Sequence, residues 1–184
     1  NDKPDAALLK LAKTETQIEV CAQMLASAKR IPESLPLLWA GVNQVDDASG
    51  HIPLLAWWTL EAKAEKDSAG VLAFLREDQA FRSSKLFREH LAEKLAKRYA
   101  LAGGAENLQT CADLLTISED AALTDKFLAG IAAAFEGEPI PPLPAKLGAR
   151  LQAYLARQSG GDIAAELAKP DGLKKALKEL ANSK

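Results

Sequence analysis

The chain has 184 residues, 48% of them hydrophobic and 26% charged, a composition typical of a folded protein and not of a disordered one. Its 23 lysines and arginines nearly balance its 25 aspartates and glutamates, giving a formal net charge of −2, so no broad attraction to nucleic acid or to an anionic membrane is expected. No apolar run approaches the roughly 20 residues that a membrane span needs, which predicts a soluble chain without direct membrane insertion. Because the sequence begins at Asn1 without a methionine or a leader, we expect a processed product or a piece of a longer protein.

Alanine and leucine dominate the chain, and nowhere do β-branched and aromatic residues alternate over the length of a strand. Both features favour helix throughout. Stretches rich in glycine, proline, aspartate and serine interrupt the pattern at intervals of helix length. In chain order the predicted helices are 5–13, 16–30, 34–45, 52–66, 68–76, 80–101, 105–116, 120–135, 144–157, 162–168 and 172–181. The segment 136–144, "EGEPIPPLP", is expected to be a softer joint.

A weak internal repeat connects these helices. Shifting the sequence by 34 residues against itself matches apolar positions, and pairs Ile18 with Ile52, Val20 with Leu54, Cys21 with Leu55, Ala22 with Ala56 and Met24 with Trp58. Degenerate two-helix units explain these matches better than one compact bundle does. The sequence therefore predicts an all-α fold, a right-handed α–α superhelix of about four to five HEAT-like helix pairs, that forms a single domain over 1–184.

The stretch "HIPLLAWWTLEAK", residues 51–63, predicts an inner helix of this array. On a helical wheel its apolar side chains surround the first turns, so neighbours must cover it on several sides. The adjacent indoles of Trp57 and Trp58 lie about 100° apart and are expected to meet different neighbours. Pro53 falls in the first turn, where its missing amide costs nothing. The residues predicted to form the structural core are Trp39, Ile52, Leu55, Trp57, Trp58, Leu91 and Leu95.

The segment 80–101 predicts an amphipathic helix with a solvated charged face. Its apolar stripe consists of Phe87, Leu91, Leu95 and Tyr99, and its cations are Arg82, Lys85, Arg88, Lys94, Lys97 and Arg98. The cations are scattered around most of the circumference, with Glu89 and Glu93 among them, so they form no continuous basic face. A solvated helix surface is therefore favoured over a phosphate-binding role.

Cysteines and histidines provide no predicted metal or haem site. Cys21 and Cys111 have no neighbouring Cys or His at ligand spacing, and we expect both to be buried free thiols, with a disulfide as the alternative. His90 and Glu93 have the spacing found on one helix of a di-iron bundle, but the second such motif is absent. The other histidine, His51, is expected at the start of a helix.

The only candidate ligand site combines His51, Trp57 and Glu61. An aromatic ring beside a carboxylate is suited to a carbohydrate or a cationic ligand, and Glu61 stands out on an otherwise apolar helix. More often such a carboxylate bridges to a neighbouring repeat. No nucleophile–base pair and no phosphate-binding glycine loop is present in the sequence, so we predict no catalytic and no cofactor-binding residue in this segment.

Residues 34–67, "SLPLLWAGVNQVDDASGHIPLLAWWTLEAKAEKD", resemble the helical-repeat region of large secreted bacterial proteins of the membrane-bound dehydrogenase and haem-binding (c-type cytochrome) type. In that family a helix with a Leu-Pro-Leu-Leu-Trp-like core precedes an acidic turn and a His-Ile-Pro-Leu-Leu-x-Trp-Trp-x-Leu-Glu helix. The corresponding residues are Leu35 to Trp39, then Asp46 and Asp47, then His51 to Glu61. The specific match is confined to this stretch, and the later helical pattern is compatible with the same region.

The resemblance implies HEAT-like repeats between a β-propeller and a c-type cytochrome domain, in a protein located outside the cytoplasm. This sequence has neither a Cys-x-x-Cys-His haem site nor a strand-rich region, so no redox role passes to its residues. The function expected is a non-catalytic scaffold that contacts flanking domains of the same polypeptide or another protein. The alternative is a small-ligand or enzymatic module near Trp57 and Glu61.

Overall fold

A computed structural model describes residues 4–46, 50–118, 120–136, 140–158 and 172 of the chain. Within these ranges every regular element is a helix and no strand is present, which confirms the predicted all-α class. The predicted helix 162–168 lies outside the described residues, as does all but the first residue of the predicted helix 172–181.

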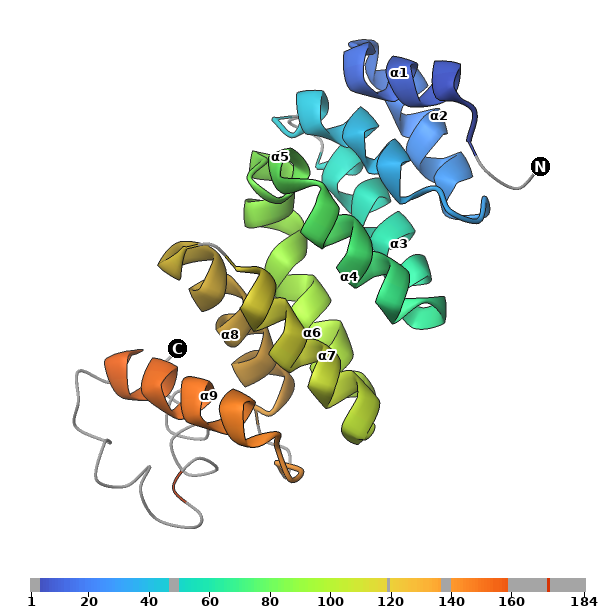
Figure 1. The fold of residues 1–184 in the computed structure, drawn as a ribbon. Helices are drawn as coiled ribbons and strands as arrows, with labels where there is room; N and C mark the ends of the chain where they lie inside the picture. Colours follow the sequence, from blue (N-terminus) through green and yellow to red (C-terminus); the bar gives the residue numbers. More distant parts are fainter. Residues whose placement is uncertain (1–3, 47–49, 119, 137–139, 159–171, 173–184) are drawn as a thin grey trace. The chain divides into compact units, whose positions relative to one another are not determined.

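The helices follow the predicted order (Figure 1). They are α1 (Ala6–Thr14), α2 (Ile18–Ala28), η1 (Leu35–Gln44), α3 (His51–Lys66), α4 (Ser68–Glu77), α5 (Gln79–Arg82), η2 (Leu86–Leu91), α6 (Ala92–Ala102), α7 (Gly104–Ile117), α8 (Ala121–Ala134) and α9 (Ala145–Gln158). Aspartates cap several of them in the way that helix starts favour: the side chains of Asp5, Asp67, Asp78 and Asp120 each accept a hydrogen bond from a backbone amide three residues on.

Two segments differ from the prediction in the kind of helix. Residues 35–44 form a 3₁₀ helix. The sequence did not predict this type of helix, because over ten residues the apolar pattern hardly distinguishes three residues per turn from 3.6. The predicted helix 80–101 is divided at Ser83 and Ser84, residues whose hydroxyls favour turns over helix interiors. Ser84 Oγ accepts a hydrogen bond from the Phe87 amide at 3.2 Å, and the chain then passes through the π-helical turn η2 into α6.

The chain divides into two compact units, residues 1–95 (unit 1) and 96–184 (unit 2). The boundary falls within α6. The expected softer joint, 136–144, lies inside unit 2, and its residues 137–139 are outside the described part of the chain. The single domain over 1–184 stays a prediction.

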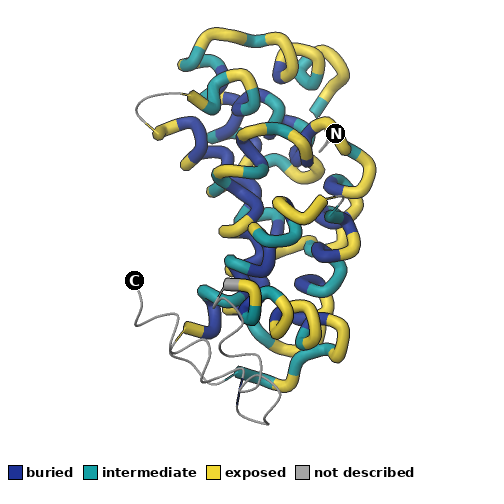
Figure 2. Tube along the Cα trace, turned by 90° about the vertical axis from the view of Figure 1, so that its left-hand side faces the viewer, coloured by how far each residue is buried: buried dark blue, intermediate teal, exposed yellow. Residues whose placement is uncertain are grey.

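In unit 1, α3 is the central helix. It packs against α2, η1, α4 and η2, and Ile52, Ala56 and Leu60 are fully buried on it. Figure 2 shows buried residues along the inside of this unit and exposed ones along its outer turns. An aromatic cluster extends the core, in which the Phe81 ring centroid lies 5.1 Å from that of Phe74 and 5.7 Å from that of Phe87. The prediction that α3 is covered on several sides is therefore confirmed.

In unit 2, the three helices α7, α8 and α9 pack against one another. Their core consists of leucines, phenylalanine and isoleucine in one stripe per helix, with Leu114, Phe127, Ile131, Leu147, Leu151 and Leu155 all at most 1% exposed. Arg157 Nη2 pairs with Asp125 Oδ1 at 2.5 Å, between α9 and α8.

The predicted core residues have different outcomes. Ile52, Leu55, Leu91 and Leu95 are buried, as predicted, and so are the other members of the stripe on 80–101, Phe87 and Tyr99. Trp39 and Trp57 are half-buried. Trp58 is 44% exposed, and its prediction as a core residue is wrong.

Trp58 is exposed because of its position on the surface of α3. Leu54, one turn before Trp58, is 40% exposed, so the two residues share a side of α3 that the four neighbouring helices leave uncovered. Arg82 differs in the opposite sense. Predicted on a solvated face, it is only 4% exposed, because its guanidinium donates hydrogen bonds to the Leu75 and Arg76 carbonyls at the end of α4.

Candidate functional site

Cations gather in unit 1 where the C-terminal ends of α2 and α3 meet. Helix α2 ends at Ala28, and the following turn carries Lys29 and Arg30. From α3, Lys63 Nζ donates hydrogen bonds to the carbonyl of Ile31 at 2.5 Å and to that of Lys29 at 3.5 Å. These carbonyls follow the end of a helix and have no partner within it, so an ammonium group stabilises them. Lys63 therefore joins the end of α3 to the turn that follows α2.

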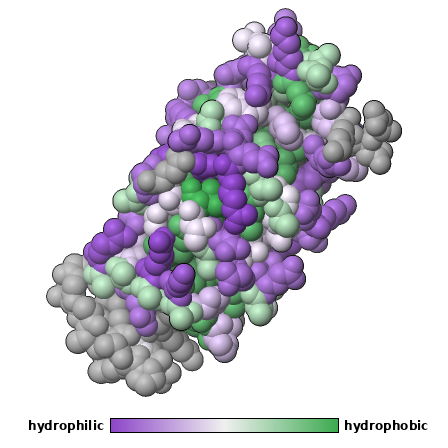
Figure 3. All heavy atoms as spheres, viewed as in Figure 1, coloured by the Kyte–Doolittle hydropathy of each residue, from purple (hydrophilic) through white to green (hydrophobic). Residues whose placement is uncertain are grey.

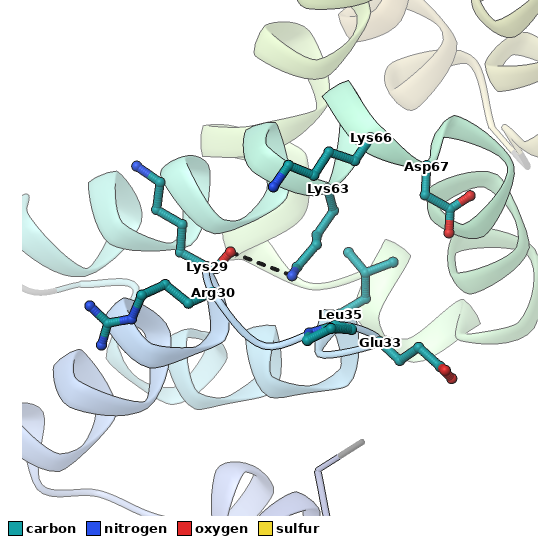
Figure 4. Close-up of a pocket in the computed structure, with 8 residues that line it drawn as sticks. Lys29, Arg30, Glu33, Leu35, Lys63, Lys66 and Asp67 are labelled. Carbon is teal, nitrogen blue, oxygen red and sulfur yellow. Dashed lines mark hydrogen bonds between the residues drawn. The ribbon is translucent and has the colours of Figure 1, made fainter. Parts of the chain in front are cut away.

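A cavity of about 250 Å³ opens at this place. Its lining residues are Lys29, Arg30, Pro32, Glu33, Leu35, Lys63, Lys66 and Asp67. Figure 4 shows Lys63 and Lys66 reaching from α3 toward the turn that carries Lys29 and Arg30, whereas the carboxylates of Glu33 and Asp67 lie on the other side. The cavity thus has a cationic side and an acidic side.

The cationic side outweighs the acidic one. Four cations and two carboxylates give the lining a formal charge of +2, on a chain whose net charge is −2. Asp67 Oδ1 already accepts the Gly70 amide at 2.8 Å as the cap of α4. Burial lowers the pKa of the Lys63 ammonium, and the charge of Lys66 lowers it further. The effect of Lys66 shows that the two ammonium groups on α3 repel each other.

The backbone of the turn is also strained. Glu33 has φ = 51° and is the only residue other than glycine with a positive φ in the described part of the chain. This left-handed conformation is unfavourable for a residue with a side chain, and such positions tend to occur where binding fixes the backbone.

The residues that line the cavity include two pairs separated by the same distance in the sequence. Lys29 and Lys63 are 34 residues apart, and so are Glu33 and Asp67. This is the shift that aligns the apolar positions of the same two segments. These residues were not predicted as a site because only the apolar positions were compared at the 34-residue shift, although the same shift also aligns the charged residues.

A second feature adjoins the cavity. The exposed side chains of Leu54 and Trp58 lie one turn apart on α3, and Lys29 Nζ lies 5.9 Å from the centre of the Trp58 ring. At this distance the ammonium is attracted to the face of the indole. Hydrophilic residues cover most of the surface shown in Figure 3, with hydrophobic residues visible between them.

The three residues of the candidate ligand site, His51, Trp57 and Glu61, lie along one helix, α3. His51 is exposed, whereas Trp57 and Glu61 are half-buried. Ten residues of α-helix separate His51 from Glu61, a distance of roughly 15 Å along the axis. Lys94 Nζ lies 6.0 Å from the centre of the Trp57 ring, so a cation of the chain itself covers this indole. Neither of the two cavities described here is lined by any of the three residues.

Unit 2 has a cavity of about 350 Å³ between α7 and α9. Its lining residues are Gln109, Ala112, Asp113, Leu115, Thr116, Lys146, Leu147 and Arg150. Arg150 Nη1 donates to the Leu115 carbonyl at 3.0 Å, and Gln109 Nε2 donates to Asp113 Oδ1 at 3.0 Å. Two polar groups of its wall are thus already engaged with the protein.

Both cysteines are buried free thiols, as predicted. Burial raises the pKa of Cys111 to about 12, and burial together with nearby Glu15 raises the pKa of Cys21, so neither sulfur is activated as a nucleophile. Among the described residues no group of three or more His, Cys, Asp or Glu side chains is placed to hold a metal ion. In the same part of the chain, none of the helices combines the length and apolarity that a bilayer crossing requires.

Comparison with protein-family models, with curated proteins and with solved structures gave no match for this chain. The fold and the site described above define its class: a protein whose described elements are all helical, with a basic pocket where the ends of α2 and α3 meet.

Proposed function

We propose that the chain is a non-catalytic repeat scaffold, an α–α superhelix of HEAT-like helix pairs. It makes contacts with flanking domains of the same polypeptide or with another protein. Following the resemblance of residues 34–67, the larger protein is a secreted bacterial one of the membrane-bound dehydrogenase and haem-binding type. A location outside the cytoplasm rests on that resemblance alone.

The observation that carries the proposal is a set of side-chain hydrogen bonds between residues 28 to 39 positions apart, a separation near the 34-residue shift found in the sequence. In unit 1 Asn43 and Gln44 donate to carbonyls 30 and 28 residues earlier, Thr59 donates to one 34 residues earlier, and Trp39 Nε1 donates to Asp78 Oδ2, 39 residues later. In unit 2 Arg150 reaches a carbonyl 35 residues earlier. Contacts limited to neighbouring units are the defining property of stacked repeats.

The exposed pair Leu54 and Trp58 supports a role in protein contacts. An indole has a surface of roughly 250 Å², so covering the exposed 44% of Trp58 removes about 110 Å² from water and contributes about 2–3 kcal/mol. This is the size of effect found for aromatic anchors at the centre of protein interfaces. A framework position would not leave that stabilisation unused.

Site-specific photo-crosslinking tests the proposal. The photoreactive residue p-benzoylphenylalanine replaces Trp58 in the full-length protein within its source cell, and a control places it at Ala73, an exposed position on α4. We expect position 58 to crosslink to a segment outside residues 1–184 or to a second protein, and position 73 to do so much less. Equal crosslinking at both positions, or crosslinks only within 1–184, would contradict a contact surface on α3.

A further inference from the structure

We propose that the cavity between the ends of α2 and α3 binds an oxyanion, the phosphate or carboxylate group of a small molecule, through Lys29, Arg30 and Lys66. The site adjoins the exposed pair on α3, since Lys29 also lies over the Trp58 ring, but the binding of an anion does not depend on the scaffold proposal.

These three cations do not neutralise carboxylates in the part of the chain that the structure describes. Lys63 alone donates to the free carbonyls beyond α2. Lys29, Arg30 and Lys66 form no ion pair among the described residues, and all three are exposed. Two other exposed cations do pair with carboxylates, Lys85 with Asp46 and Arg157 with Asp125.

The size and the lining of the cavity suit a small anionic group. A volume of about 250 Å³ is below the range of drug-sized pockets and suits an anionic group with a few attached carbon atoms. Pro32 and Leu35 supply apolar contact surface within it. Arg30 offers a planar fork of donors and the two lysines offer mobile point charges, which together are the donors that recognise phosphate and carboxylate groups.

Lys63 and Lys66 repel each other. Their mutual repulsion contributes to the lowered pKa of Lys63, and an anion placed beside both relieves it. Binding therefore has a readout within the site, because the ε-methylene signals of Lys63 and Lys66 report a nearby anion by NMR.

The experiment titrates the folded chain with inorganic phosphate, with succinate and with sodium chloride at matched ionic strength, and follows the lysine ε-methylene signals. We expect saturable shifts of Lys63 and Lys66 in the millimolar range with phosphate or succinate and not with chloride. The anion that binds more tightly identifies the source of the oxyanion. If neither anion differs from chloride, the site does not exist as proposed.

The double substitution Lys29→Gln and Lys66→Gln removes two of the three cations and leaves Lys63 to hold the carbonyls. It is expected to weaken binding by roughly tenfold or more, as loss of charge-assisted hydrogen bonds does. The matched control is Lys10→Gln with Lys97→Gln, two exposed lysines outside the cavity. Equal loss of binding in both double variants would reduce the effect to general surface charge and overturn the proposal. Circular dichroism checks that both variants are folded.

Discussion

The substitution Thr59→Val tests the packing of α3 against α2. Thr59 on α3 is fully buried, and its Oγ1 donates a hydrogen bond of 2.8 Å to the carbonyl of Leu25 in α2. Valine keeps the shape and the β-branch of threonine but cannot donate. The substitution therefore removes one hydrogen bond between α3 and α2 and creates almost no cavity.

The magnitude follows from what each partner loses. A buried hydrogen bond contributes a net of about 0.5–1.5 kcal/mol to the free energy of unfolding. The Leu25 carbonyl keeps a longer bond of 3.4 Å from the Lys29 amide, so it is not left without a donor, which limits the loss. We expect Thr59→Val to cost about 1 kcal/mol, and to lower the melting temperature of a unit of this size by about 4–8 °C.

Urea unfolding followed by far-ultraviolet circular dichroism measures the change, with Thr110→Val as the matched control. Thr110 on α7 is also buried, but its hydroxyl donates at 3.0 Å to the Glu106 carbonyl of the same helix, a bond that adds little to helix stability. We expect the control to cost less than half as much. If Thr59→Val is no more destabilising than Thr110→Val, the hydrogen bond between α3 and α2 does not stabilise their packing.

Three other predictions concern single positions. Gly41→Ala is expected to destabilise unit 1 by about 1–2 kcal/mol in urea unfolding, because the new Cβ would lie 3.0 Å from Cδ2 of the fully buried Leu86; an unchanged midpoint would show that the core yields. Glu33→Gly should be more stable than Glu33→Ala by about 0.5–1 kcal/mol, since both lack the carboxylate and only alanine retains the strain at φ = 51°. Burial raises the pKa of Cys111 from 9.0 to about 12, so its stabilisation is complete below pH 9 and is lost as the pH rises toward 12. Relative to Cys111→Ala, the wild type should lose about 1.4 kcal/mol between pH 7 and pH 10, and parallel pH profiles would contradict this.

The helices were largely predictable from the sequence because their signals are local. Each break contains residues that end helices or cap the next one, and Asp67, Asp78 and Asp120 act as caps in the structure. The type of helix at 35–44 was not predictable. Gly41 on η1 closely approaches Leu86 and Ile52, contacts between segments that a local pattern does not contain.

The environment of Trp58 shows a different limit. The periodicity of α3 gives the direction of each side chain, but it does not tell which directions have a neighbouring helix. Trp57 and Trp58 appear equivalent in the sequence, yet the first is half-buried beside Lys94 and the second is exposed beside Lys29. An apolar pattern around a whole helix therefore predicts several contacts, and one of them can be supplied by another protein.

The basic pocket, in contrast, was within reach of the sequence. In a stack of repeats, residues separated by one period occupy corresponding corners of adjacent units, so like charges at that spacing are brought near each other. Lys29 and Lys63 stand at that spacing, and so do Glu33 and Asp67. Within the cavity itself, the charge of Lys66 lowers the pKa of Lys63, and the proposed oxyanion, placed beside both ammonium groups, would relieve that repulsion.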